Sequence, residues 1–344
     1  MSKMKRHRSL NGPLNRAFLS NRTPLYPIPP VPECLSTCTQ AFDNISTLRI
    51  RSRGNNCLDL FSLRGANMAL KNFANAATVI TGGASGIGLA TARALYSRGA
   101  HVVLADINAQ GLEQAKQAVG QENLTSNAHI LTVATDVTNE AQVNALMQET
   151  LQTCGRIDLV VTSAGVGRGG PIDLFTSEEM QRMMNINFLG TFHCVRAALP
   201  AMRQQQGGHF VFLSSVAGKL GVPLLSGYCA SKWAVRGFSI ALRAELYGTG
   251  IGFTTVYPAW VDTPMIHQEA DAMQLLNIEA LLTPDQVAAA ILEAVENDQH
   301  DLTLAPNQDI AIVLQLMKDN PEQAEEAMGR SFRHRIAQIS GQSH

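Results

Sequence analysis

Residues 77–88 read Ala-Thr-Val-Ile-Thr-Gly-Gly-Ala-Ser-Gly-Ile-Gly, and this stretch decides the fold. The β-branched run Ala77–Thr81 predicts a buried strand. The glycines after it permit a tight turn, and the pattern beyond the turn predicts a helix over Ile87–Ser97. A strand, a glycine-rich turn and a helix in succession suit the pyrophosphate of a dinucleotide. The bare backbone allows close approach, and the helix N-terminus offers free N–H groups.

The turn is expected to contact the cofactor through Gly82, Ser85, Gly86, Ile87 and Gly88. The next strand, His101–Ala105, ends beside Asp106, 18 residues after Gly88. A carboxylate at this place hydrogen-bonds the adenosine ribose 2′-hydroxyl and repels a 2′-phosphate, so Asp106 favours NAD over NADP. The alternative is an Asp106 that only caps the following helix.

From Ala77 onward the chain alternates short apolar runs with longer helical patterns. Strands are predicted at 77–81, 101–105, 130–134, 157–162, 210–213, 253–257 and 301–304, and helices at 87–97, 109–119, 140–153, 177–203, 228–247 and 284–295. Apolar strands separated by helices predict a parallel sheet covered on both faces. We therefore expect an α/β fold with a single doubly wound, Rossmann-type domain of about seven parallel strands.

Four polar residues in the second half of the chain are candidates for acid–base chemistry. Tyr228 and Lys232 share one helix face, Ser215 ends a strand 13 residues before Tyr228, and Asn187 lies on the long helix before that strand. A phenol has a pKa near 10, and a nearby ammonium lowers it. Each residue also has an ordinary alternative. The spacing of Tyr228 and Lys232 can arise by chance, Ser215 can simply end a strand, and Asn187 can face water on its helix.

The turn 81–88 and the segment 228–232, in this order, resemble the short-chain dehydrogenase/reductase family, over about residues 72–305. The resemblance implies a catalytic tetrad of Asn187, Ser215, Tyr228 and Lys232. Tyr228 is then the acid–base group, and Lys232 also holds the nicotinamide ribose. Ser215 hydrogen-bonds the substrate oxygen and stabilises its charge. Asn187 holds a water that connects Lys232 to solvent.

The resemblance implies further cofactor contacts after three strands, from Asp136, Val137, Ser163, Gly165, Pro258, Val261 and Thr263. Two positions depart from the family pattern. Ser163 stands where the family usually has Asn, and Ala259 stands where it has Gly, which removes easy access to positive φ. The loop that faces the nicotinamide is therefore expected to be slightly reshaped, with Val261 and Thr263 still able to contact the carboxamide.

Substrate specificity is expected from the loop 259–282 and from residues near 165–171 and 220–226. The loop carries the apolar residues Trp260, Met265, Ile266, Met273, Leu275, Leu276, Leu281 and Leu282. Such a wall suits a hydrophobic or medium-sized alcohol or ketone. The alternative is that these side chains pack a lid helix on the core.

Residues 1–67 differ from the rest of the chain in charge and composition. They hold ten Lys and Arg against three acids, a net +7 that leaves −8 for the remainder of a chain of net charge −1, and six of the 14 prolines. Such a segment is expected to be disordered. We favour a dispensable extension, with a transit peptide and a nucleic-acid or membrane-surface arm as alternatives. Residues 68–308 then form the catalytic domain, and 309–344 form a tail of one or two amphipathic helices.

The sequence thus predicts an oxidoreductase that moves a hydride between NAD(H) and an alcohol/ketone pair. The alternative is a non-catalytic NAD(H)-binding sensor, against which the intact tetrad argues. No stretch reaches the roughly 20 apolar residues of a membrane span. The six cysteines lack metal-site spacing, and the acidic remainder disfavours nucleic acid. We expect a cytoplasmic homodimer or homotetramer without a metal, or an organelle enzyme if residues 1–67 target it there.

Overall fold

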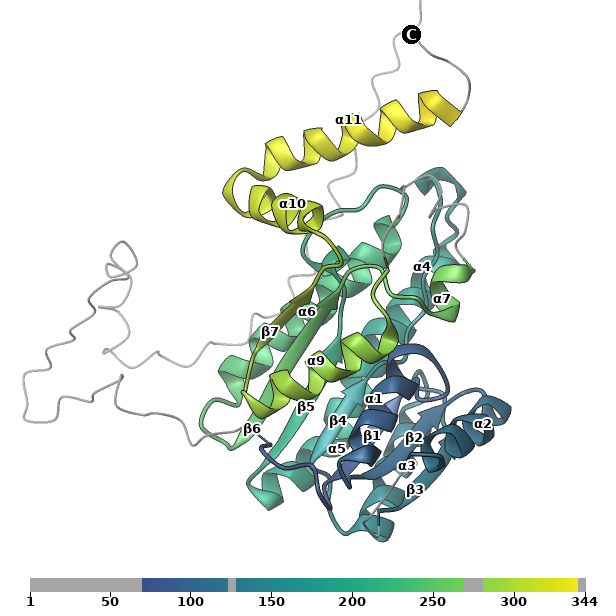
Figure 1. Cartoon of the computed structure of the whole chain (residues 1–344), viewed down its shortest axis with the longest axis vertical. Helices are drawn as coiled ribbons and strands as arrows, with labels where there is room; N and C mark the ends of the chain where they lie inside the picture. The colour runs from purple at the N-terminus through teal and green to yellow at the C-terminus, as the bar shows by residue number, and fades with distance from the viewer. Residues whose placement is uncertain (1–69, 123–127, 269–280, 340–344) are drawn as a thin grey trace, which may run out of the picture. The chain divides into compact units, whose positions relative to one another are not determined.

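The computed structural model describes residues 70–122, 128–268 and 281–339, all within the compact unit Arg64–His344 (Figure 1). These residues form one sheet of seven strands in the order β3-β2-β1-β4-β5-β6-β7, and every neighbouring pair is parallel. This confirms the prediction of a doubly wound α/β fold. The bounds are β1 Ala77–Thr81, β2 His101–Asp106, β3 Ile130–Ala134, β4 Leu159–Thr162, β5 Gly208–Leu213, β6 Ile251–Pro258 and β7 Asp301–Leu304.

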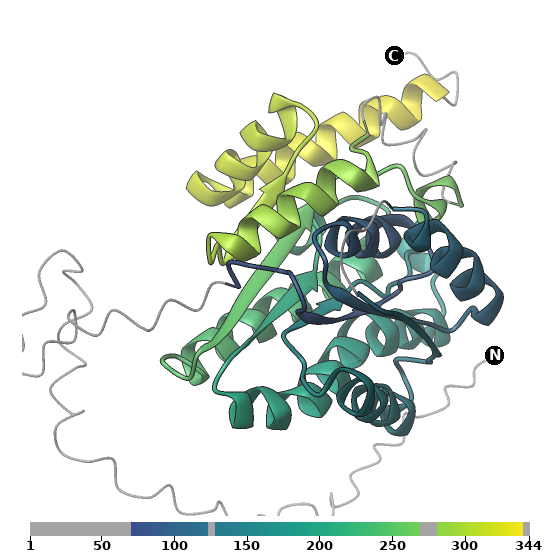
Figure 2. The same cartoon turned by 60° about the horizontal axis from the view of Figure 1, so that its bottom comes forward.

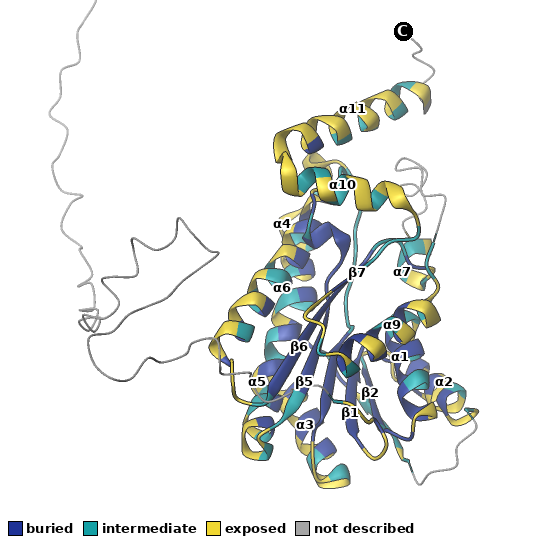
Figure 3. Ribbon diagram, turned by 60° about the vertical axis from the view of Figure 1, so that its left-hand side comes forward, coloured by how far each residue is buried: buried dark blue, intermediate teal, exposed yellow. Residues whose placement is uncertain are grey.

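Helices cover both faces of the sheet, as Figures 1 and 2 show. Successive strand residues point to opposite faces, so Val79 belongs to one hydrophobic core and Ile80 to the other. Figure 3 shows the inner strands buried between the two helical layers, which is why they are rich in apolar residues, whereas the edge strands β3 and β7 are only partly buried. The core around Ile80 contains α1 Gly86–Ser97, α2 Ala109–Gly120 and α9 Pro284–Glu296, and the core around Val79 contains α3 Glu140–Cys154, α5 Gly190–Gln205 and α6 Ser226–Glu245.

The strand order reverses between β1 and β4, because the chain runs from β1 to β2 and β3 on one side and then to β4 on the other. Ligands of open α/β sheets bind at such a reversal, outside the carboxyl ends of the strands. The glycine turn after β1 meets the loop after β4 here. A Cβ atom at Gly82 would come within 2.7 Å of the Ala164 nitrogen. The fold therefore places the predicted turn where a ligand would bind.

The long predicted helix 177–203 changes its hydrogen-bond pattern along its length. It consists of α4 (Ser177–Met184), a π-helical turn η4 (Asn185–Leu189) and α5. The strand predicted to begin at residue 157 begins at Leu159, because the N–H and C=O groups of Ile157 bond the Gln205 side chain at 3.0 and 2.8 Å. The other elements agree with the predicted bounds to within two residues.

The C-terminal segment contains two helices, α10 (Gln308–Asp319) and α11 (Pro321–Ile339). The predictions for residues 1–67 and for Met273, Leu275 and Leu276 lie outside the described residues. In the part of the chain that the structure describes, no helix has both the length and the apolar character needed to cross a bilayer. The compartment stays a prediction from the sequence.

Candidate active site

A cavity of about 1140 Å³ opens at the carboxyl ends of the strands. Its wall brings together the turn after β1, the end of β2, the loops after β3, β4, β5 and β6, and helix α6. Two predicted residues, Gly88 and Asn187, are buried behind the wall. The other predicted residues line it, namely Gly82, Ser85, Gly86, Ile87, Asp106, Asp136, Val137, Ser163, Gly165, Ser215, Tyr228, Lys232, Pro258, Val261 and Thr263.

The glycine turn forms a cradle that side chains would fill. Gly82 has a φ of +68° and Gly86 a φ of +54°, a backbone region that favours glycine. A Cβ atom at Gly88 would lie 2.2 Å from the Gly82 carbonyl oxygen. Helix α1 begins at Gly86, so its first N–H groups lie at the cavity wall. This bare backbone at a helix N-terminus fits a dinucleotide pyrophosphate.

Asp106 braces the turn from the end of β2. One carboxylate oxygen accepts a hydrogen bond from the Ala84 N–H at 3.2 Å, and the other accepts one from the Asn108 N–H at 3.0 Å. The cap of helix α2 is Asn108, whose side chain accepts from the Gly111 N–H at 3.0 Å. Asp106 is therefore not the helix cap, and its half-buried carboxylate forms part of the cavity wall.

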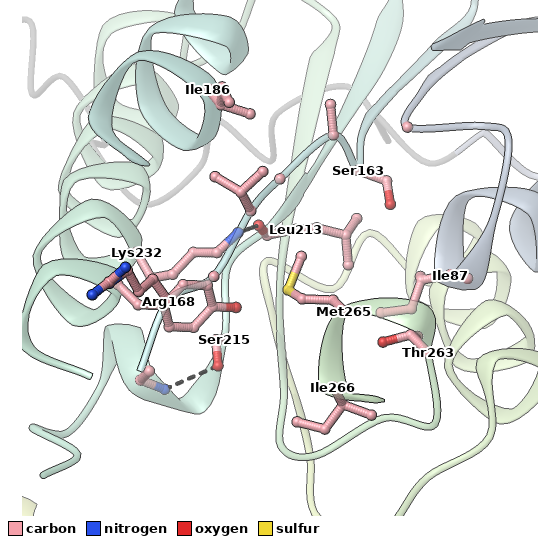
Figure 4. Close-up of a pocket in the computed structure, with 18 of the residues that line it drawn as sticks. Ile87, Ser163, Arg168, Ile186, Leu213, Ser215, Lys232, Thr263, Met265 and Ile266 are labelled. Carbon is pink, nitrogen blue, oxygen red and sulfur yellow. Dashed lines mark hydrogen bonds between the residues drawn. The ribbon is translucent and has the colours of Figure 1, made fainter. Parts of the chain in front are cut away.

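Tyr228 and Lys232 of helix α6 line the cavity, as does Ser215, which follows β5. Figure 4 shows Lys232 and Ser215 at this wall. Lys232 Nζ donates to the Leu213 carbonyl oxygen at 2.8 Å and lies 5.5 Å from the centre of the Tyr228 ring. Ser215 Oγ accepts from the Ala217 N–H at 3.1 Å and donates to the Pro258 carbonyl oxygen at 3.3 Å. The three predicted side chains thus gather around one space.

Burial acts on the two titrating groups in opposite directions. It raises the pKa of Tyr228 to about 12, and a hydrogen bond with Ser215 works against this rise. Burial lowers the pKa of Lys232 to about 8. The sequence predicted a lowered Tyr228 pKa, but burial raises it instead, so Tyr228 is a neutral phenol at pH 7.

Asn187 lies in the π-helical turn, and its side chain is fully engaged with protein groups. Its Oδ1 accepts from the Val166 N–H at 2.8 Å, and its Nδ2 donates to the Val166 carbonyl oxygen and to Ser231 Oγ, both at 2.9 Å. These bonds hold the loop after β4 against the helices. Its predicted role in binding a water stays a prediction.

The structure adds lining residues that the sequence did not single out. Helix α4 contributes a polar wall, and the loop after β4 adds Arg168, which pairs with Glu179 and lies over the Phe175 ring. Only the tertiary arrangement reveals this polar wall, because the sequence gives no sign that the helix borders a site. Its residues are Ser177, Glu178, Gln181 and Arg182 of α4, followed by Asn185 at the start of the π-helical turn.

The loop after β6 supplies part of the cavity wall. Trp260, Met265 and Ile266 line the cavity, and Met265 lies near its centre in Figure 4. Leu281 and Leu282 are not among the lining residues. The loop includes the short helix α7 (Pro264–His267). Ala259 avoids positive φ, and its N–H donates to the Leu304 carbonyl oxygen at 2.8 Å.

Residues 76–274 match the family model for short chain dehydrogenases. A 3-ketodihydrosphingosine reductase of Mus musculus is 31% identical over 221 residues, which cover 62% of this chain and 67% of that protein. An uncharacterised oxidoreductase of Staphylococcus aureus is 33% identical over 234 residues, which cover 66% of this chain and 96% of that protein. The family match therefore covers strands β1 to β6 and the segments that line the cavity.

Solved structures agree with the sequence matches. A short-chain dehydrogenase/reductase of Burkholderia phymatum in complex with NAD superposes with a TM-score of 0.67 at 28% identity, covering 73% of this chain and 96% of that one. Levodione reductase superposes with a TM-score of 0.64 at 30% identity, covering 70% and 99%. The chain is an oxidoreductase that belongs to the short-chain dehydrogenase/reductase family.

Proposed function

We propose that this protein transfers a hydride between NAD(H) and an alcohol/ketone pair, with Tyr228 as its acid–base group. The observation that carries the proposal is the wall of one cavity, which contains Tyr228, Ser215 and Lys232 together with the glycine turn. A proton donor, an oxyanion partner and a dinucleotide cradle are the groups that such a reaction needs.

The cradle and its surroundings support NAD as the cofactor, and its nicotinamide ring would give or accept the hydride. The turn after β1 would hold the pyrophosphate, and Val261 and Thr263 would contact the carboxamide. Asp106 supports NAD over NADP, because a carboxylate at the end of β2 repels a 2′-phosphate. The cavity wall, within the described residues, contains the cations Arg168, Arg182 and Lys232. None of them lies in the glycine turn or at the end of β2, where a cation could pair with a 2′-phosphate. A family relative was solved with NAD, which is consistent with this choice.

The side chains of the site would handle the proton. In ketone reduction, the neutral Tyr228 phenol gives its proton to the substrate oxygen, and in alcohol oxidation it takes the proton back. Ser215 Oγ donates a weak hydrogen bond of 3.3 Å to the Pro258 carbonyl oxygen, and it would donate to the substrate oxygen instead once the substrate is bound. Lys232, whose Nζ makes one hydrogen bond to Leu213, has two N–H groups left for a ribose.

The substrate side of the cavity favours a hydrophobic or medium-sized ketone. Trp260, Met265, Ile266, Val222 and Leu225 supply apolar surface near Tyr228. The name of one relative, 3-ketodihydrosphingosine reductase, describes the reduction of a ketone. This supports the same chemical class for the present chain.

A second copy of the chain would cover an exposed face of helix α6. Trp233 and Ile240 lie seven residues apart on α6 and are 46% and 48% exposed, and Tyr247, just beyond the end of the helix, is 60% exposed. Residues seven apart lie on one helix face, so Trp233 and Ile240 form an apolar stripe. Such a stripe is typical of a subunit interface, which supports the proposed homodimer or homotetramer.

A panel of alcohols and ketones tests the proposed activity through the absorbance of NADH. Turnover of at least one hydrophobic ketone with NADH supports the proposal. NADH binding without turnover across the panel would favour the sensor alternative, and the absence of NADH binding would reject the cofactor assignment as well.

A further inference from the structure

Ser231 lies between the two catalytic residues of helix α6 in the chain, yet it does not line the cavity. It is fully buried, and its hydroxyl has both a donor and an acceptor partner. Ser231 Oγ donates to the Tyr228 carbonyl oxygen at 2.8 Å and accepts from Asn187 Nδ2 at 2.9 Å. Through this hydroxyl, the side chain of Asn187 is tied to the backbone of the residue that carries the proposed proton donor.

Asn187 extends the connection to the other side of the cavity. Its side chain bonds both the N–H and the C=O group of Val166, and Val166 belongs to the loop after β4 that lines the cavity. The neighbouring Gly167 approaches the Tyr228 ring so closely that a Cβ atom there would lie 3.9 Å from Tyr228 Cδ2. One chain of hydrogen bonds therefore joins Val166, Asn187, Ser231 and Tyr228.

We propose that Ser231 is a positioning residue, whose hydroxyl locks the loop after β4 and the π-helical turn against helix α6 and so fixes Tyr228 relative to the substrate. Loss of the hydroxyl leaves one Asn187 N–H buried without its partner, and an unpaired buried donor drives local rearrangement. Small displacements at a reacting centre have large effects on rate. The proposal rests on the proposed function, because the rate effect requires the Tyr228 chemistry.

Helix α6 supplies a matched control in Ser239. This serine is also fully buried and hydrogen-bonds Thr255 on β6 and Arg243, but it is absent from the cavity wall. Both Ser231→Ala and Ser239→Ala remove a buried hydroxyl from the same helix. Only the first removes the connection to Asn187.

The test compares Ser231→Ala, Ser231→Thr and Ser239→Ala in the full chain. We expect Ser231→Ala to lower kcat by about tenfold or more while the NADH dissociation constant changes less than about threefold. Ser231→Thr, which keeps the hydroxyl, should recover part of the rate. Ser239→Ala should retain kcat within about twofold, even if its melting temperature falls as much as that of Ser231→Ala. Equal kcat in Ser231→Ala and wild type, or equal losses of kcat in the two alanine variants, would overturn the proposal.

Two further measurements depend neither on turnover nor on a known substrate. Hydrogen exchange at the Val166 amide should be accelerated in Ser231→Ala and unchanged in Ser239→Ala, since Asn187 Oδ1 protects that amide. In the Asn187→Ala background, Ser231→Ala should add no further effect on exchange. Unchanged exchange would overturn the inference alone, whereas a wild type without turnover would overturn the proposed function instead.

Discussion

At the scale of single residues, burial shifts the pKa values of Tyr228 and Lys232 in opposite directions. Both side chains are withdrawn from water, which disfavours the charged form of each. The phenol therefore keeps its proton, with a pKa raised to about 12, and the amine loses its proton more easily, with a pKa lowered to about 8. At pH 7 the site holds a neutral acid beside a positive charge, which suits the delivery of a proton to a ketone.

This pairing predicts a pH dependence for ketone reduction. Lys232 is protonated below its lowered pKa, so its charge is present at pH 7 and is lost as the pH rises through about 8. Tyr228 stays protonated over the same range. We expect kcat for reduction to be constant from pH 6 to 7 and to decline above about pH 8, measured in buffers of constant ionic strength. A kcat that stays constant up to pH 10 would contradict the role of Lys232.

Asp106 is predicted to set the cofactor preference and also to support the turn. Asp106→Ala should reduce the ratio of kcat/KM for NADH over NADPH by about tenfold or more, because the carboxylate no longer repels the 2′-phosphate. It should also weaken NADH binding, because the Ala84 N–H loses its partner. Steady-state kinetics of the wild type and the variant with both cofactors measure this ratio. A wild type that already prefers NADPH would refute the assignment.

At the scale of elements, the turn between β1 and α1 is packed so tightly that it requires glycine. Gly88→Ala places a Cβ atom 2.2 Å from the Gly82 carbonyl oxygen, so the turn must shift. We expect a loss of about 1–3 kcal/mol in the free energy of unfolding together with a large rise in the NADH dissociation constant. Chemical denaturation and fluorescence titration measure the two effects.

Gly120→Ala is the matched control for this substitution. Gly120 ends helix α2, and a Cβ atom there would meet nothing closer than an Ile130 methyl carbon at 3.8 Å. Its free energy of unfolding should be unchanged or higher by up to about 1 kcal/mol, because alanine is the better helix former. Similar losses of NADH affinity in both variants would show that the turn has no special role.

Local patterns predicted the elements well, because each strand and helix carries its own period and its own end signals. The π-helical turn at Asn185–Leu189 was not predicted, since its cause is not local. The turn carries Asn187, whose partners are 21 and 44 residues away. The same limit explains why Ser231 and the polar wall of α4 were missed. Their importance depends on contacts that only the assembled sheet creates.

At the scale of the whole molecule, the strand order assembles the site from segments spread along the chain. The reversal between β1 and β4 sets the glycine turn beside the loop that Asn187 holds, and the next strand, β5, delivers Ser215 to the same edge. The motifs indicated these residues by their order and spacing. Their convergence on one cavity follows from the parallel sheet, whose strands all end at the same edge.

Assembly into oligomers is predicted to depend on the stripe on helix α6. Trp233→Glu should convert a dimer into a monomer, or a tetramer into a smaller assembly, because a charge replaces buried apolar surface at the contact. Light scattering after size exclusion gives the number of chains. Ile312→Glu, at an Ile of α10 that is 61% exposed, serves as the control and should leave that number unchanged. A wild-type monomer would refute the proposed assembly.

The central claim is that Tyr228 moves the proton of the reaction, and Tyr228→Phe tests it most directly. The substitution removes only the phenolic oxygen, so the NADH dissociation constant should stay within about threefold of wild type, while turnover of the best ketone falls by about 10²-fold or more. Tyr96→Phe, at a tyrosine of α1 that is absent from the cavity wall, should keep wild-type turnover. Turnover retained by Tyr228→Phe would contradict the account.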